Sequence, residues 1–334
     1  MLENISLKPY NSFGIDVLAR KFAVFSDEEQ LKELLAGPGN EAPFILGGGS
    51  NVLFTKNIDG LVLKNDIRGI DLIKEDERHI YVHVGGGESW HPFVMYCIQR
   101  HWAGIENLSL IPGNVGAAPM QNIGAYGVEL KEVFDELEAY DLKEKKIRVF
   151  TVNDCQFGYR DSVFKKQFKD RFVILRVTFR LNKVPHFNTR YGVIEEELGK
   201  MGVKELSIEA ISQAVIRIRT SKLPDPMQIG NAGSFFKNPG IPKNLFINLR
   251  NEFPGIVGYE NSDGTIKLAA AWLIESCGWK GFRRGDAGCH AKQALVLVNY
   301  GHATGKEIYN LSTEIQQSVF RKFGVKLERE VNII

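Results

Sequence analysis

The sequence predicts an α+β fold, in which a two-part unit comes first and one further α+β domain is appended to it. A short apolar strand at Phe44–Leu46 leads into Gly47–Gly49, and another at Ile80–Val84 leads into Gly85–Gly87, so two similar small units follow each other. Segments rich in β-branched and aromatic residues then dominate as far as residue 181. Beyond the prolines near residue 225, helical spacing becomes frequent.

The domain boundaries follow from these changes of pattern. We expect a first subdomain at residues 1–70, joined by the C-terminal strand 324–334, and a second subdomain at residues 71–222. The segment SKLPDP at residues 221–226 has the proline-rich composition of a junction. Residues 223–323 then form the appended domain.

Helices are predicted from capping signals and apolar periodicity. Ser26 followed by Glu29 is a capping box, which predicts a short helix as far as residue 35. The segment Lys306–Phe323 has one apolar face and a glycine stop at Gly324. The other predicted helices are Trp90–Ile98, Ile208–Ile218 and Ala269–Cys277.

The remaining strands are predicted from apolar runs and from alternation. They are Val52–Phe54, Leu61–Leu63, Val133–Asp141, Lys146–Val152, Phe172–Leu181 and Val325–Ile333. In the last strand apolar and charged residues alternate, which puts Glu330 on the same face as Lys326 and Glu328. From this pattern alone, Glu330 would be a solvated carboxylate.

Composition narrows the class of protein. The chain has 334 residues, 44% of them hydrophobic and 25% charged, with a net charge of +2, so we expect neither nucleic acid nor an acidic membrane surface as a partner. No obligate protein partner is implied. The four cysteines form no CxxC pair, and we predict neither a disulfide framework nor a metal site. The first residues do not resemble a signal peptide, which predicts a cytoplasmic protein.

The stretch Asn107–Val128 carries no charged side chain, and its prolines forbid a continuous helix. Its glycines would let the backbone turn sharply and approach a ligand with N–H groups free to donate. Two interpretations stay open for this stretch taken alone: an anion cradle made from main chain, or a buried glycine-rich packing loop.

Familiar nucleotide motifs do not fit. Gly85–Gly87 follows a strand, but Trp90 stands where a dinucleotide-binding GxGxxG motif needs its third glycine. The segment at residues 301–306, GHATGK, is one residue short of a Walker loop and lacks the Ser or Thr after Lys. These departures exclude a P-loop ATPase.

Five motifs in order carry a family resemblance. They are GGGSNVL at 47–53, IPGNVGAAPMQNIGAYG at 111–127, FGYRDS at 157–162, NAGSFFKNP at 231–239 and LEREV at 327–331. The first two resemble the FAD-binding fold of the vanillyl-alcohol-oxidase type. Together, the five resemble the UDP-N-acetylenolpyruvoylglucosamine reductases, also called UDP-N-acetylmuramate dehydrogenases, over nearly the whole chain.

The resemblance implies non-covalent FAD held by two loops, with NADPH as the hydride donor. No His or Cys lies inside either loop to form a covalent link, although Cys155 and His91 stay open as candidates. The implied cofactor-binding residues are Gly47, Gly48, Gly49, Ser50, Asn51, Pro112, Gly113, Gly116, Ala117, Ala118, Gln121, Ile123, Gly124, Ala125, Tyr126 and Gly127. Ala117 and Ala118 replace Gly or Ser of many relatives, so no hydroxyl bond to FAD is expected there.

Three residues match the family's catalytic positions. Arg160 would stabilise the substrate carboxylate, Ser234 would donate a proton, and Glu330 would handle charge as a protonated donor or through water, which requires a raised pKa. Without the resemblance, Arg160 would pair locally with Asp161, and Ser234 would cap a turn.

Substrate-binding positions also match. Lys222, Asn238 and Gln293 would contact the sugar nucleotide, UDP-N-acetylglucosamine enolpyruvate, and Tyr191 matches a mobile tyrosine found in one branch of the family. In that branch NADPH and the sugar nucleotide take turns in one site. Relatives often carry Arg and Gly after the Glu-Val pair, whereas this chain has Asn332, so we expect the chain end near Glu330 to fray.

Two alternative functions stay open at the level of sequence. Another FAD-linked oxidoreductase on the same fold, such as a sugar or lactone oxidase, would not need Arg160, Ser234 and Glu330 together. A flavin- or nucleotide-binding protein without catalysis would not need any of the three.

Overall fold

The computed structural model describes residues 1–37, 42–189, 192–261 and 263–334. These residues divide into two compact units. Unit 1 comprises residues 1–5, 19–49 and 58–221, and unit 2 comprises residues 6–18, 50–57 and 222–334. The predicted junction at residues 221–226 therefore coincides with the start of the last segment of unit 2. The division into three domains stays a prediction.

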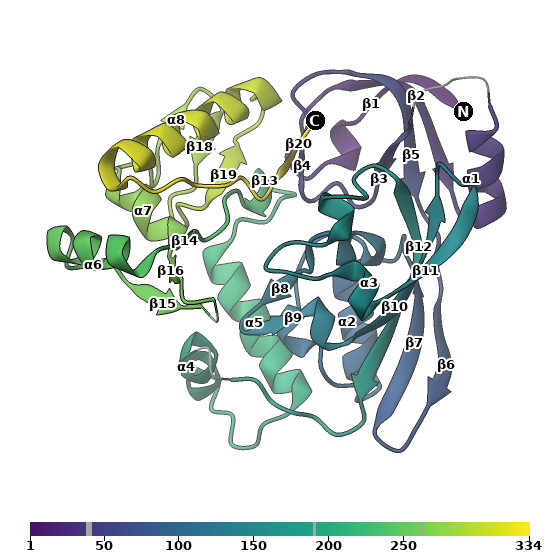
Figure 1. Cartoon of the computed structure of the whole chain (residues 1–334), viewed down its shortest axis with the longest axis horizontal. Coiled ribbons are helices and arrows are strands. Elements are labelled where there is room, and N and C mark those ends of the chain that lie inside the picture. Colours follow the sequence, from purple (N-terminus) through teal and green to yellow (C-terminus); the bar gives the residue numbers. More distant parts are fainter. Residues whose placement is uncertain (38–41, 190–191, 262) are drawn as a thin grey trace. The chain divides into compact units, whose positions relative to one another are not determined.

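Unit 1 contains a mainly parallel sheet in the order β1-β2-β5-β3 (Figure 1). The strands are β1 (Leu2–Ser6), β2 (Leu18–Phe25), β5 (Ile58–Asn65) and β3 (Phe44–Leu46). Both β2 and β3 run parallel to β5. Helix α1 (Glu28–Leu35) follows β2 along the chain and buries Leu31.

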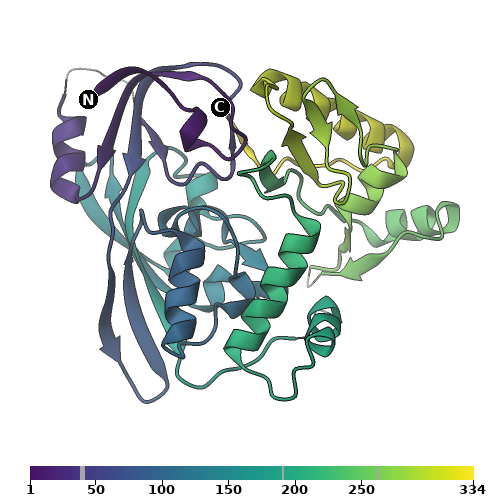
Figure 2. The same cartoon turned by 180° about the vertical axis from the view of Figure 1, so that it is seen from behind.

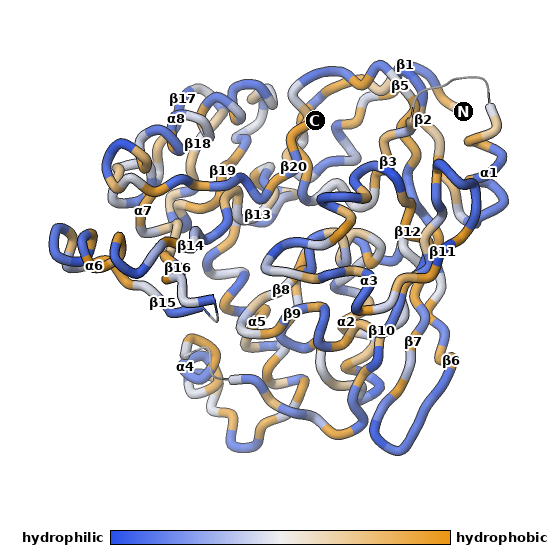
Figure 3. Tube along the Cα trace, viewed as in Figure 1, coloured by the Kyte–Doolittle hydropathy of each residue, from blue (hydrophilic) through white to orange (hydrophobic). Residues whose placement is uncertain are grey.

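Unit 1 also contains a five-stranded antiparallel sheet in the order β11-β10-β12-β7-β6. Its strands are β6 (Ile70–Glu75), β7 (His79–Gly85), β10 (Phe134–Asp141), β11 (Lys146–Thr151) and β12 (Phe172–Asn182). The first half of strand β12 is buried on both faces: Ile174 packs in the cluster around α2, and its neighbour Leu175 packs in the cluster around α1. Figure 3 shows hydrophilic residues gathered at the tip of the β6–β7 hairpin.

The helices and turns of unit 1 lie between and after these strands. Figure 2 shows α2 and α5 side by side, and the hydroxyl oxygen of Ser212 on α5 lies 3.9 Å from the sulfur of Met95 on α2. The elements are α2 (Trp90–Gln99), η2 (Glu106–Leu108), η3 (Val115–Ala117), η4 (Pro119–Gln121), β8 (Gly124–Ala125), β9 (Val128–Glu129), η5 (Leu130–Glu132), α3 (Val152–Cys155), η6 (Val163–Lys165), α4 (Gly192–Lys200) and α5 (Ile208–Lys222).

Among its described residues, unit 2 combines short sheets with the α-helices α6, α7 and α8 and one short 3-10 helix, η1. One sheet has the order β13-β19-β18-β17 and another the order β14-β16-β15, and β20 pairs with β4 in parallel. The elements are η1 (Lys8–Tyr10), β4 (Val52–Leu53), β13 (Gly230–Ser234), β14 (Gly240–Ile241), α6 (Lys243–Glu252), β15 (Gly258–Glu260), β16 (Ile266–Leu268), α7 (Ala270–Ser276), β17 (Arg283–Arg284), β18 (Ala287–Cys289), β19 (Val296–Asn299), α8 (Gly305–Phe323) and β20 (Asn332–Ile333). None of the helices that the structure describes in either unit has the length and apolar character needed to cross a membrane.

The α+β class is confirmed, and most predicted elements are found within a few residues of their predicted bounds. The predicted capping box of α1 is wrong by one position. Asp27, not Ser26, is the N-cap, and its Oδ1 accepts from Gln30 N at 2.8 Å. The side chain of Gln30 reaches back and accepts from Ser26 N at 3.0 Å. Asp is as good an N-cap as Ser, so two overlapping patterns competed.

Candidate active site

The first glycine loop, residues 47–49, directly follows β3 and lies close to the backbone of the second loop. A Cβ on Gly48 would lie 2.5 Å from Asn114 Oδ1 and 2.9 Å from Gly113 Cα. Gly49 has a φ of +61°, a conformation that glycine adopts without strain. The loop can therefore keep its course only with glycine at position 48, while glycine at position 49 avoids backbone strain.

The second loop, residues 112–127, is tied to the start of α2 by main-chain hydrogen bonds. Gly116 N donates to Gly86 O at 2.9 Å, and Trp90 N donates to Gly113 O at 2.9 Å. The loop contains the short turns η3 and η4 and no α-helix. The prediction that its prolines prevent a continuous helix is confirmed.

The loop ends in the β8–β9 hairpin. Tyr126 and Gly127 form its turn with φ values of +50° and +82°, the left-handed geometry of a tight two-residue hairpin. The side chain of Tyr126 packs against the apolar cluster of α4 and α5. Asn107 Nδ2 donates to Tyr126 O at 3.2 Å and so fixes the turn.

Gly85–Gly87, which fails as a dinucleotide motif, has a packing role that the sequence did not reveal. A Cβ on Gly86 would lie 2.7 Å from Ile174 O, and a Cβ on Gly87 would lie 2.6 Å from Asp66 Cα. Since Gly86 O also accepts from Gly116 N, this triple glycine is the support on which the second loop rests.

Arg160 stands at the tip of a tight turn in unit 1. Gly158 and Asp161 bond each other through their main chains, and Arg160 has a φ of +53°. Its Nη2 donates to Gly124 O, which ties it to the second loop. Asp161 forms an ion pair with Lys166. The structure thus joins Arg160 to the predicted cofactor loop.

Arg219 on α5 is a candidate that the sequence analysis missed. Its Nε donates to Leu110 O at 3.2 Å. Burial lowers the pKa of its guanidinium, and the charge of nearby Arg160 lowers it further, against the opposing effect of Tyr126. The described residues provide no carboxylate within ion-pair distance of Arg219. A usable signal existed, because Arg219 continues the apolar stripe of Ile211 and Val215.

Ser234 ends β13 in unit 2, where the neighbouring residues hold it firmly. Gly233 has a φ of +69°, and its N–H donates to Asn231 Oδ1 at 2.9 Å. Phe235 and Phe236 are fully buried beyond it. Ser234 is partly exposed as a residue, and its hydroxyl makes no hydrogen bond with another described residue.

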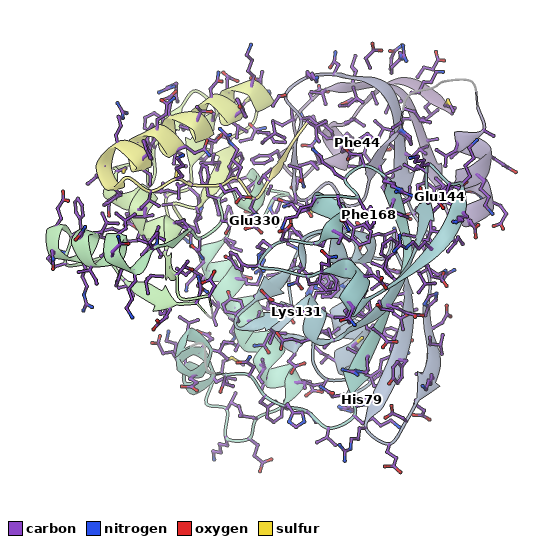
Figure 4. All side chains as sticks on the ribbon, viewed as in Figure 1. Phe44, His79, Lys131, Glu144, Phe168 and Glu330 are labelled. Atoms are coloured by element: carbon purple, nitrogen blue, oxygen red, sulfur yellow. The ribbon has the colours of Figure 1, made fainter. Side chains whose placement is uncertain are left out.

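Glu330, labelled in Figure 4, lies on a segment that pairs with the residues after Ser234. Its N–H donates to Phe235 O at 2.8 Å, and Lys237 N donates to Glu328 O at 2.9 Å. The structure therefore brings Ser234 and Glu330 onto adjacent chain segments of unit 2.

The expected fraying of the chain end is wrong. Asn332 donates to Asn51 O through its N–H at 3.1 Å and through Nδ2 at 2.9 Å. Ile334 N donates to Leu53 O at 3.0 Å, and Ile334 O accepts from Thr55 N at 2.8 Å. Parallel pairing of β20 with β4 holds the end of the chain, and Asn51 Nδ2 also donates to Glu330 O at 3.3 Å.

The predicted substrate-binding residues differ in how firmly the fold holds them. Asn238 Oδ1 accepts from Ala270 N at 3.0 Å and so caps α7, while Gln293 Oε1 accepts from Leu295 N at 3.3 Å. Each residue therefore uses its amide oxygen to order a loop, and its NH₂ group can face a ligand. Lys222 is exposed at the end of α5. Tyr191 lies outside the described residues.

The two covalent-link candidates are engaged in the fold. Cys155 is fully buried, and burial raises the pKa of its thiol to about 12. His91 Nδ1 accepts from Leu110 N at 3.0 Å, and burial lowers the pKa of its imidazole. Among the described residues no cluster of three or more His, Cys, Asp or Glu side chains could hold a metal ion.

Two family profiles match the chain. The profile described as the FAD binding domain matches residues 20–149, and the profile of the UDP-N-acetylenolpyruvoylglucosamine reductase C-terminal domain matches residues 225–334. The solved UDP-N-acetylenolpyruvylglucosamine reductase of Thermus caldophilus shares the fold, with a TM-score of 0.70 and 23% identity, over 100% of this chain and 98% of that chain.

Curated relatives are much closer in sequence. The UDP-N-acetylenolpyruvoylglucosamine reductase of Amoebophilus asiaticus is 53% identical, covering 99% of this chain and 98% of the relative. That of Flavobacterium johnsoniae is 50% identical over the same shares of the two chains. At this identity over full length, the chain belongs to the UDP-N-acetylenolpyruvoylglucosamine reductase family.

Proposed function

We propose that the protein reduces UDP-N-acetylglucosamine enolpyruvate to UDP-N-acetylmuramate, a step of peptidoglycan precursor synthesis, with NADPH as reductant and FAD as cofactor. Family membership supports the reaction. The observation that carries the proposal is the hydrogen bond from Glu330 N to Phe235 O, because it holds the second charge-handling residue beside the segment of the proton donor. NADPH and nucleotide sugars are cytoplasmic metabolites, so we place the reaction in the cytoplasm.

The residues present fit FAD in two respects. The loops at 47–49 and 112–127 lie against each other without room for a side chain on Gly48, so main chain can approach a diphosphate closely. Arg219 contributes a largely buried positive charge near Tyr126 and Arg160, and no described carboxylate offsets it. A bound anion, or an anionic form of a ligand, would supply the missing negative charge.

When bound and reduced, FAD supplies the hydride that adds to the methylene carbon of the enolpyruvyl group. The side chains must then stabilise the enediolate that develops at the substrate carboxylate. We assign this role to Arg160, whose planar fork can hold two oxygens at once. Since its Nη2 is already bonded to Gly124 O, the guanidinium is oriented before the charge develops.

We assign proton donation at the carbon bearing the carboxylate to Ser234. Its hydroxyl is not used by another described residue, while Gly233 and Phe235 hold the backbone on either side. A serine hydroxyl is a weak acid and suits only a strongly basic carbanion, which the enediolate is. Glu330 would handle the charge of the same intermediate, and Lys222, Asn238 and Gln293 would bind the nucleotide.

The substitution Ser234→Ala tests the assignment of the proton donor. We expect flavin reduction by NADPH at the wild-type rate, and a fall of about 10²- to 10⁴-fold in reoxidation by the enolpyruvyl substrate, the usual contribution of a general acid. Stopped-flow absorbance measures the two half-reactions separately. Ser276→Ala, at the end of α7, is the matched control and should leave both unchanged.

Normal reoxidation of the Ser234→Ala variant would contradict the assignment of the proton donor.

Stopped-flow measurements also distinguish the proposed reductase from the two alternative functions. An oxidase would pass electrons from the reduced protein rapidly to oxygen, and a non-catalytic binding protein would not turn over the sugar nucleotide at all. A purified protein that is colourless and takes up no FAD would refute the whole proposal.

A further inference from the structure

The extended segment that carries Glu330, which precedes β20, has an arginine at an inward position. Leu327 and Val331 are 5% and 4% exposed, so alternation places Arg329 on the same inward face and Glu330 on the other. An apolar residue would be the ordinary choice between two buried side chains. A charged side chain at this inward position therefore requires polar partners in the structure.

Helix α8 provides a binding site for this guanidinium. Arg329 Nε donates to Ser312 Oγ at 2.8 Å, and Nη2 donates to Thr313 Oγ1 at 2.7 Å. The guanidinium carbon also lies 4.5 Å from the centre of the Tyr309 ring, within cation–π distance. Three contacts with one face of α8 thus fix the direction of the Arg329 side chain.

The two hydroxyls are arranged to accept. Ser312 Oγ donates its hydrogen to Tyr309 O at 2.6 Å, and Thr313 Oγ1 donates to the same oxygen at 3.1 Å. Each oxygen therefore turns lone pairs toward Arg329. Ser312 is fully buried, and a buried hydroxyl is stable only when it is hydrogen-bonded, which the bonds to Tyr309 O and from Arg329 Nε achieve.

Arg329 also fixes the register of the pairing that positions Glu330. Phe236 and Arg329 are bridge partners, and the bonds on either side are Lys237 N to Glu328 O and Glu330 N to Phe235 O. A slip by one residue would exchange the faces of Arg329 and Glu330, since side chains alternate along a strand. The fork of a guanidinium in a matched receptor resists such a slip.

We propose that Arg329 is a positioning residue for the reaction, which holds Glu330 in register beside Ser234 through the receptor formed by Tyr309, Ser312 and Thr313. This inference rests on the proposed function, because the register of this pairing matters to the reaction only if Glu330 takes part in it. Arg329 itself touches neither substrate nor cofactor in this account.

The substitutions Arg329→Met and Arg329→Lys test the proposal in the FAD-loaded protein. Methionine keeps the apolar stem, and lysine keeps the charge without the fork. For Arg329→Met we expect an unchanged NADPH half-reaction and reoxidation slowed by about tenfold to a hundredfold, as for a small misplacement of a reacting group. Arg329→Lys should restore only part of that rate. Equal slowing of both half-reactions would overturn the proposal.

Hydrogen–deuterium exchange provides a readout independent of activity. The amide of Glu330 should exchange faster in Arg329→Met, because its bond to Phe235 O is no longer held in register. The double variant Ser312→Ala/Thr313→Val keeps Arg329 but removes its receptor, and should reproduce both effects. Unchanged exchange at Glu330 in both variants would also overturn the proposal.

A control on the same helix separates positioning from general stability. Arg284 forms an exposed bidentate pair with Glu314 of α8, so Arg284→Met should change neither the exchange nor the half-reactions. If the wild-type protein fails to reduce the sugar nucleotide while Arg329→Met still speeds exchange at Glu330, the proposed function fails and the register role stands. If turnover is normal and Arg329→Met leaves it so, the positioning role fails alone.

Discussion

Two residues of unit 1, Arg219 and Gly48, are the most informative about the proposed FAD site. Arg219 carries a largely buried guanidinium with no described carboxylate to offset it, and its pKa is lowered by burial first. Gly48 lies where a side chain would meet Asn114 and Gly113. The uncompensated charge of Arg219 supports the proposal of an anionic ligand, and Gly48 shows that the two loops of the proposed cofactor site pack directly against each other.

The substitution Gly48→Ala is predicted to weaken FAD binding. The added Cβ would lie 2.5 Å from Asn114 Oδ1, and Asn114 is held because its Nδ2 donates to Gly87 O. The two loops would have to separate, and we expect the Kd for FAD to rise by about tenfold or more, equivalent to about 1.4 kcal/mol. Titration of the apoprotein by flavin fluorescence measures this effect.

Gly199→Ala is the matched control for that experiment. Gly199 lies in α4, where a Cβ would meet nothing within 4 Å. Alanine there should stabilise the helix by about 0.5–1 kcal/mol and leave FAD affinity unchanged. An unchanged Kd in Gly48→Ala would show that the loops yield without loss of the cofactor site.

Among the elements, the C-terminal segment differs most from its prediction, because the strand expected at Val325–Ile333 is confined to β20 at Asn332–Ile333 and the residues before it are extended without being a strand. Its alternation of buried and exposed residues is confirmed at Val325, Leu327 and Val331. Fraying was expected because termini are usually loose, yet bonds to Asn51 and Leu53 hold the last residues. No local pattern announces a partner about 280 positions away along the chain.

The substitution Asn332→Ala is predicted to loosen this element. It removes the bond from Nδ2 to Asn51 O at 2.9 Å and leaves the main-chain bond in place. We expect a loss of about 0.5–1.5 kcal/mol in unfolding free energy, the net value of one hydrogen bond, together with weaker FAD binding through the Asn51 loop. Thermal unfolding and FAD titration measure the two effects.

Asn310→Ala serves as the control for Asn332→Ala. Asn310 is exposed on α8 and has no side-chain bond within the described parts of the chain. Its replacement should leave FAD binding unchanged and should not lower the free energy of unfolding, because alanine is the better helix former. If Asn332→Ala binds FAD as tightly as the wild type, the chain end has a structural role without influence on the cofactor loop.

At the scale of the whole molecule, stability in acid is expected to depend on a partly buried ion pair in unit 1, between Asp141 and Arg171. Asp141 is 2% exposed, and hydrogen bonds from the Arg171 side chain lower its pKa to about 2, against the opposing effect of burial. A carboxyl group with a lowered pKa stabilises the fold above its unfolded pKa, near 3.9, and this stabilisation disappears as the pH falls toward 2.

The substitution Asp141→Asn should therefore lower the free energy of unfolding at pH 7 and flatten its dependence on pH between about 4 and 2. Urea unfolding at a series of pH values measures both. Asp59→Asn is the control, since Asp59 pairs with Arg20 on the exposed surface. An Asp141→Asn variant with the pH dependence of the wild type would place the acid-sensitive group elsewhere.

Much of the fold could be predicted because apolar periodicity is local. The helices α2, α7 and α8 and the strands β10 to β12 begin and end within a few residues of their predicted bounds. The helix cap at Asp27 was missed because two good N-cap residues stand side by side. The packing role of Gly85–Gly87 could not be predicted, because its close neighbours Asp66 and Ile174 are distant in the sequence or unremarkable there.

The sequence by itself determined the fold class, most elements and, through five ordered motifs, the family and its expected chemistry. The tertiary structure alone decided that Ser234 and Glu330 lie on paired segments, that the charge of Arg160 acts on Arg219, and that the chain end is held. The physical reason is the range of the interactions. Turns, caps and periodicity depend on near neighbours, whereas strand pairing and buried charge depend on which distant residues the topology brings together.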